Sequence, residues 1–143
     1  MGVLGLFRVA QALCPLMQKR GKGTLLVTSS TAAVRGNSGQ HSHAAAMGGR
    51  RMLCQSLNAQ YGPENIHVSH VVIDGPVDAP DTLGKMIGAE AFRKMRETKG
   101  AQDGLLNPSD VAETYWHLAH QHRSAWTHEI DLRPFSCLPW WNH

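Results

Sequence analysis

Charged residues, aromatic residues and cysteines are all scarce in this sequence. Of its 143 residues, 17% are charged, 6% are aromatic and three are cysteines, whereas 42% are hydrophobic. This composition is typical of one globular domain and excludes a disordered chain. The dispersed Cys14, Cys54 and Cys137 do not form the pattern of a disulfide framework or a zinc site. We expect packing thiols in a reducing, cytoplasmic compartment, with one oxidised pair as the alternative.

Long hydrophobic runs are also absent. The longest unbroken runs, such as residues 71–73, fall far short of the roughly 18 apolar residues that a membrane span requires. We therefore expect no transmembrane helix and no membrane partner.

Acidic residues are absent from residues 1–63, which contain seven lysines and arginines. The remaining residues contain the other seven basic residues and all 11 acidic ones, so the two parts carry formal charges of +7 and 7 − 11 = −4. A basic half attracts polyanions, but these cations are dispersed and lack interleaved aromatic residues for base stacking. We therefore expect no nucleic-acid partner, and we interpret the acid-free start as folded structure rather than a transit peptide.

Apolar spacing and turn residues divide the chain into alternating helices and strands. Helical spacing predicts helices over residues 3–20 and 41–61, and the glycines that follow end them. Short β-branched runs predict strands over residues 24–28, 66–73 and 126–132. Asn107 and Pro108 are typical of an N-cap and a first helical position, so a further helix should run to about residue 120. Residues 81–99 are expected to form a polar, helical flap, and residues 135–143 a tail.

Strands and helices alternate at the spacing of crossover connections. This order predicts an α/β domain with a parallel sheet, spanning residues 1–143 as one unit. His117 and His120 are spaced by three on a predicted helix. Because no cysteine or convergent carboxylate accompanies them, we interpret them as a solvated helix end and predict no metal site.

Three stretches of the sequence resemble the carboxyl half of the short-chain dehydrogenases/reductases. They are Gly-Thr-Leu-Leu-Val-Thr-Ser-Ser over residues 23–30, Gly-Pro-Glu-Asn-Ile-His-Val leading into Ile-Asp-Gly-Pro-Val over residues 62–77, and Trp-Thr-His-Glu-Ile-Asp-Leu-Arg-Pro over residues 126–134. The resemblance covers nearly the whole chain. It implies a Rossmann-like, three-layer domain that lacks its amino-terminal half, and an NAD or NADP cofactor.

The resemblance also implies where the active site lies. Ser30 stands at the position of the family's serine, which hydrogen-bonds the substrate oxygen. The family's tyrosine and lysine are replaced by His43 and Met47, so the usual proton path is missing. Two interpretations of His43 stay open: it replaces tyrosine as the acid/base, since imidazole titrates near neutrality, or it only fills the space of the tyrosine ring.

Backbone groups of Gly75, Pro76 and Val77 are implied to lie against the nicotinamide amide. The family's glycine-rich turn, which holds the cofactor pyrophosphate, has no counterpart in the sequence. We therefore expect a chain truncated at its start and impaired in catalysis.

Three hypotheses for the function follow. The first is an impaired oxidoreductase of this family, acting on a small carbonyl or alcohol substrate. The second is a non-catalytic interaction module, forming a homodimer or a heterodimer with a full-length relative through helices 3–20 and 41–61. The third is a truncated product with no stable fold.

Overall fold

The computed structural model describes residues 2–142, and within them the chain divides into two compact units. One unit comprises residues 2–72 and His117–Ile130, and the other comprises Ile73–Trp116 and residues 131–142. Over the described residues, no helix combines the length and the apolar character needed to cross a membrane.

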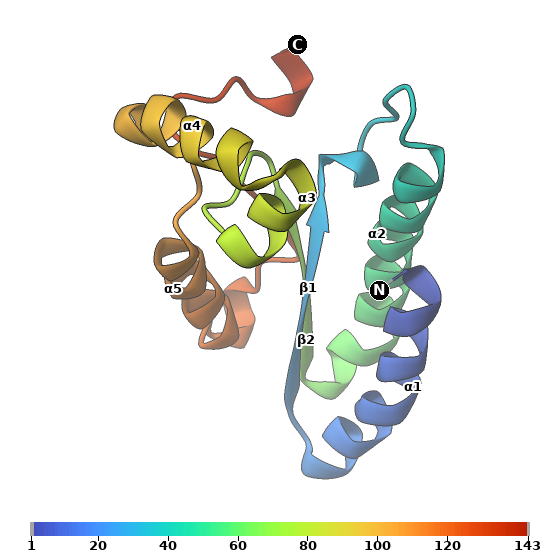
Figure 1. Cartoon of the computed structure of the whole chain (residues 1–143). Coiled ribbons are helices and arrows are strands. Elements are labelled where there is room, and N and C mark those ends of the chain that lie inside the picture. The colour runs from blue at the N-terminus through green and yellow to red at the C-terminus, as the bar shows by residue number, and fades with distance from the viewer. Residues whose placement is uncertain (1, 143) are drawn as a thin grey trace. The chain divides into compact units, whose positions relative to one another are not determined.

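Two long helices, α1 (Val3–Arg20) and α2 (His41–Tyr61), form much of the first unit. They lie side by side along one face of β1 and β2 (Figure 1). Leu6, Ala10 and Cys14, spaced four residues apart, form the buried stripe of α1. The helix ends at Gly21, which adopts the left-handed conformation with φ 69°, as the glycine-rich ending predicted.

The sheet has three parallel strands in the order β1-β2-β3, which confirms the predicted α/β class. They are β1 (Gly23–Ser30), β2 (Ile66–Ile73) and β3 (Glu129–Leu132). Seven of the eight residues of β2 are buried, as expected of a strand covered on both faces. The core of the first unit joins the buried stripes of both helices to these strands and comprises Leu6, Ala10, Cys14, Val27, Cys54, Leu57, Ile66 and Val68.

The last strand is shorter than the predicted range of residues 126–132, because a side chain satisfies the backbone before Glu129. The Thr127 N–H donates to the side-chain oxygen of Gln121 at 2.9 Å, where a strand residue would pair with its neighbour. The Trp126 indole N–H donates to the Gln121 carbonyl at 3.3 Å. This glutamine therefore anchors the segment that leads into β3.

The second unit contains the predicted flap, which is not one helix. A π-helical turn over Pro80–Gly84 leads into the short α3 (Lys85–Ile87), and α4 (Ala89–Lys99) follows. Gly88, with φ 91° and ψ 147°, separates α3 from α4. Helical periodicity alone did not indicate this break, because the flanking residues all favour helix.

The helix predicted to run from Pro108 to about residue 120 is present, and most of it belongs to the second unit. The helix α5 (Pro108–Ala119) begins with a cap, because the Asn107 side-chain oxygen accepts the Ser109 N–H at 3.1 Å. In the tail, the Trp140 N–H donates to the Asp74 carboxylate at 3.0 Å. His143, the final tail residue, lies outside the described residues.

Candidate active site

A serine and a histidine meet at the carboxyl end of β1. Ser30 is the last residue of β1, two residues beyond the end of the predicted strand, and His43 lies in the first turn of α2. The Ser30 Oγ and the His43 Nε2 are 3.0 Å apart, which is hydrogen-bond distance. The His43 side chain is exposed and Ser30 is half-buried, so the pair is open to a ligand.

Met47 lies one helical turn after His43 and is 7% exposed. Its thioether sulfur accepts the Ser29 hydroxyl at 3.6 Å and lies 3.8 Å from a guanidinium nitrogen of Arg50. A thioether is a weak acceptor with no proton to donate. The position therefore cannot supply the cation that would favour ionisation of a neighbouring acid, nor a donor for a ribose hydroxyl.

The segment Gly75–Val77 belongs to the second unit. Val77 forms a parallel bridge with Leu106, in which the Leu106 N–H donates to Pro76 and the Asp78 N–H donates to Leu106. The Val77 N–H takes no part in this bridge. A backbone amide donor matches the chemistry of a carboxamide oxygen such as that of nicotinamide, whereas the Met47 thioether offers no donor.

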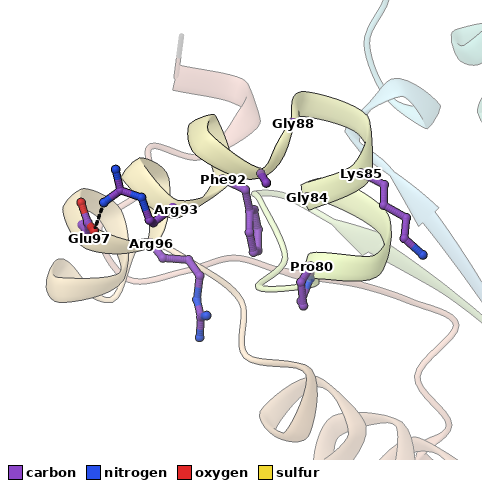
Figure 2. A pocket seen from close by; sticks show the side chains of 9 residues that line it. Pro80, Gly84, Lys85, Gly88, Phe92, Arg93, Arg96 and Glu97 are labelled. Atoms are coloured by element: carbon purple, nitrogen blue, oxygen red, sulfur yellow. Dashed lines mark hydrogen bonds and ion pairs between the residues drawn. The ribbon is translucent and has the colours of Figure 1, made fainter.

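The segment from Pro80 to Glu97, within the second unit, carries an open cavity of about 800 Å³ (Figure 2). Phe92 points into it beside Gly84 and Pro80, and its side chain is 6% exposed. The cations at its rim are paired: Arg93 contacts Glu90 and Glu97 at 2.6 Å, and Arg96 contacts Asp78 at 3.0 Å. The cavity therefore offers an apolar floor with a charge-balanced rim, which suits an uncharged, apolar group.

Sequence reasoning missed a network around Glu129 in the first unit. Arg51 binds the Glu129 carboxylate with two hydrogen bonds of 2.7 and 2.8 Å. His70, on β2 and fully buried, lies with its Nδ1 3.0 Å from the same carboxylate. Because a carboxylate only accepts, Nδ1 carries the proton, and the buried Nε2 is left with a lone pair that has no partner within residues 2–142.

This network favours a neutral His70. Burial lowers the pKa of His70, and the hydrogen bond to Glu129 opposes that effect only in part. The hydrogen bond from Arg51 lowers the pKa of the Glu129 carboxyl, which keeps it ionised near neutrality. The only signal in the sequence was the presence of polar residues, His67, Ser69 and His70, within a predicted buried strand.

We predict that the free energy of unfolding falls as the pH is lowered below about 7. The unfolded histidine titrates near 6.5 and the folded one at lower pH, so the unfolded state takes up the proton first. The contribution of His70 to the free energy of unfolding is complete above about pH 6.5 and is lost as the pH falls toward the pKa of the folded state. The free energy of unfolding then changes by at most ~1.4 kcal/mol per pH unit. Urea unfolding between pH 8 and pH 5.5 measures this.

The matched variants are His70→Gln and His41→Gln. The first keeps a donor for Glu129 but removes the titration, so its stability should depend less on pH. The second removes an exposed histidine and should leave the dependence unchanged. Equal pH dependence in the wild type and His70→Gln would contradict this prediction.

The remaining candidate groups are the potential metal ligands and the cysteines. Over residues 2–142, no three His, Cys, Asp or Glu side chains gather as metal ligands would. All three cysteines are free thiols. Burial raises the pKa of the Cys54 thiol to about 12, which makes it unreactive near neutral pH.

Comparisons with known proteins identify the family. A family model described as enoyl-(acyl carrier protein) reductase matches residues 1–130. The short-chain reductase protein NovJ of Streptomyces niveus is 32% identical over 114 residues, which cover 77% of this chain and 43% of that protein. The chain therefore belongs to the short-chain dehydrogenase/reductase family.

Solved structures agree with this assignment. A short-chain dehydrogenase from Rhodopseudomonas palustris is 32% identical, with a TM-score of 0.60 over 85% of this chain and 43% of that one. A 7 alpha-hydroxysteroid dehydrogenase complexed with NADH is 23% identical, with a TM-score of 0.73. The match covers 93% of this chain and 51% of the dehydrogenase. The chain thus spans about half the length of the relatives it matches and has a Rossmann-like α/β fold.

Proposed function

We propose that this chain is an impaired NAD(P)(H)-dependent oxidoreductase, which binds a carbonyl or alcohol oxygen but transfers its proton poorly. The observation that carries this is the Ser30 hydroxyl 3.0 Å from the His43 imidazole. These two groups offer hydrogen bonds to a substrate oxygen. A nicotinamide cofactor, when bound, supplies or accepts the hydride.

The division of roles follows from the side chains. Ser30 donates to the substrate oxygen and stabilises negative charge that develops on it. His43 holds the serine hydroxyl in place and exchanges a proton with it. Met47 places a buried thioether where the family has a lysine, so no cation assists proton transfer. The Val77 N–H is the donor that would hold the nicotinamide carboxamide.

Turnover by the wild-type chain should accordingly be slow. A positioned acid or base contributes about 10²- to 10⁴-fold to a rate, and a typical enzyme completes about ten turnovers per second. With small ketones and aldehydes, we therefore expect NADPH or NADH oxidation at least about 100-fold slower than that typical rate. The measurement is the loss of reduced cofactor over time at high protein concentration. Turnover as fast as that of a typical enzyme would overturn the proposed impairment.

A second candidate function is an interaction module that pairs with a second copy or a full-length relative. It is favoured by large apolar side chains left exposed on the two long helices: Leu4 (58%), Phe7 (44%), Leu13 (40%), Leu16 (53%) and Met52 (61%). Exposed apolar surface of this kind is typical of subunit contacts. Sedimentation of the purified chain distinguishes the candidates, because a monomer that shows slow turnover supports the oxidoreductase alone.

A further inference from the structure

An open, basic cavity of about 750 Å³ lies in the first unit, at the amino end of β1. Its lining includes Arg20 and Lys22, which lie at the end of α1, and Arg123 from the segment after α5. None of its lining residues is an aspartate or a glutamate. Gly23 begins β1 and Ser30 ends it, so the cavity lies roughly 23 Å from the Ser30 and His43 pair, at about 3.3 Å per strand residue.

The positive charge of this cavity is not balanced by neighbouring carboxylates. Within residues 2–142, the ion pairs of the molecule involve other cations, and Arg20, Lys22 and Arg123 form none. Glu64, next in sequence to a lining residue, accepts a hydrogen bond from the neutral Gln18 amide at 2.7 Å and keeps its charge, so it offsets at most one of the three cations. The absence of acidic residues before position 64 leaves this region without further counter-charges.

Helix dipoles offset only part of this charge. The carboxyl ends of α1 and α5 face this region, and each carries roughly half a negative charge. Together they offset about one of the three permanent cations. A net positive charge remains, and it attracts a multiply charged anion more strongly than a single carboxylate.

The walls of the cavity are held in place by hydrogen bonds and ring stacking. The Asn65 side-chain amide donates to the Gly21 carbonyl at 2.9 Å, which fixes the turn that carries Lys22. The Trp126 ring stacks on His67, with centroids 4.9 Å apart and an angle of 4° between the planes. A fixed aromatic ring beside three cations is the combination that binds a planar base next to phosphate groups.

We propose that this cavity binds a polyphosphate group, with the tryptophan ring available to a nucleotide base. Arg20, Lys22 and Arg123 bind the phosphate oxygens through charge-assisted hydrogen bonds, and Trp126 contacts the base. The site is separate from the Ser30 and His43 pair, and its ligand does not take part in hydride transfer there. The shared chemistry is the polyphosphate, which a nucleoside triphosphate or inorganic triphosphate supplies.

Isothermal titration calorimetry of the full chain tests this at pH 7.5, in low salt with EDTA. Inorganic tripolyphosphate and ATP are the two probes. We expect saturable binding of both with one site per chain, and affinity that falls as salt is raised. Tighter binding of ATP than of tripolyphosphate indicates a nucleotide, and equal binding indicates the phosphates alone as the recognised group.

The variants Arg123→Gln and Arg8→Gln form a matched pair. Each removes one positive charge, but Arg8 is an exposed residue of α1 that does not line the cavity. We expect Arg123→Gln to weaken tripolyphosphate binding about tenfold and Arg8→Gln to leave it unchanged. A thermal melt of each variant establishes that it is folded.

Three results would overturn the proposal. The first is the absence of saturable binding to the folded chain. The second is equal weakening of tripolyphosphate binding by Arg123→Gln and Arg8→Gln, because that result would show attraction to the net charge only. The third is a single-stranded oligonucleotide that binds tenfold more tightly than ATP, which identifies a nucleic-acid surface. Ser30→Ala should not change the binding, so the outcome is independent of the proposed oxidoreductase activity.

Discussion

Replacing Ile66 with alanine should lower the free energy of unfolding by about 2–5 kcal/mol. Ile66 opens β2 and is completely buried in the core of the first unit, with Leu57 and Val68 in the same cluster. The change removes three buried carbons and leaves a cavity that the packed helices and strands cannot fill. Both the lost burial and the cavity destabilise the fold.

Urea denaturation followed by circular dichroism measures this loss. Ile66→Val, which removes one methylene, should cost only about 0.5–1.5 kcal/mol. Met86→Ala is the surface control, because its side chain is 76% exposed and such changes stay within about 0.5 kcal/mol. A loss of less than about 1 kcal/mol for Ile66→Ala would show that β2 is not packed as the structure describes.

Gly75→Ala should destabilise the second unit by about 2–4 kcal/mol, for two separate reasons. Gly75 has φ +154°, a conformation that a residue with a side chain adopts only with strain. A Cβ at this position would lie 2.5 Å from the Pro134 Cδ, so the proline ring or the backbone would have to move. The same shift would displace the neighbouring Val77 N–H, to which the proposed function assigns the nicotinamide carboxamide.

Gly48→Ala is the matched control for this glycine. Gly48 lies in the interior of α2, and a Cβ there would meet no atom within 4 Å. Alanine favours helix, so this change should stabilise the chain by up to about 1 kcal/mol. Thermal melts of both variants give the comparison. The account of Gly75 would be wrong if both variants melted within a degree of the wild type.

The elements that local patterns specify were predictable from the sequence. The buried stripe of α1 and its ending at Gly21 follow from helical spacing and one glycine, and the burial of β2 follows from its apolar run. The failures have local physical causes. A glutamine side chain at residue 121 delays β3, and Gly88 separates two helices in a stretch that otherwise favours one.

The candidate site was predictable only in part. Ser30 and His43 are 13 residues apart, and the spacing of the family motif was enough to predict that they lie close together, as their 3.0 Å separation shows. The network of Arg51, His70 and Glu129 was not predictable, because Arg51 and Glu129 are 78 residues apart and no local pattern connects them. The basic cavity was visible only as an acid-free first half, since its third cation, Arg123, comes from the other end of the sequence.

The central claim is that Ser30 acts on the substrate oxygen. The most direct measurement is kcat/KM for NADPH oxidation with a carbonyl compound, compared between the wild type, Ser30→Ala and Ser42→Ala. Ser42 is an exposed serine beside His43 in sequence and serves as the control. The account predicts a slow wild-type rate, at least about a tenfold loss for Ser30→Ala, and no loss for Ser42→Ala. Oxidation that is equal in all three proteins would contradict it, and no oxidation above the blank would favour the interaction module.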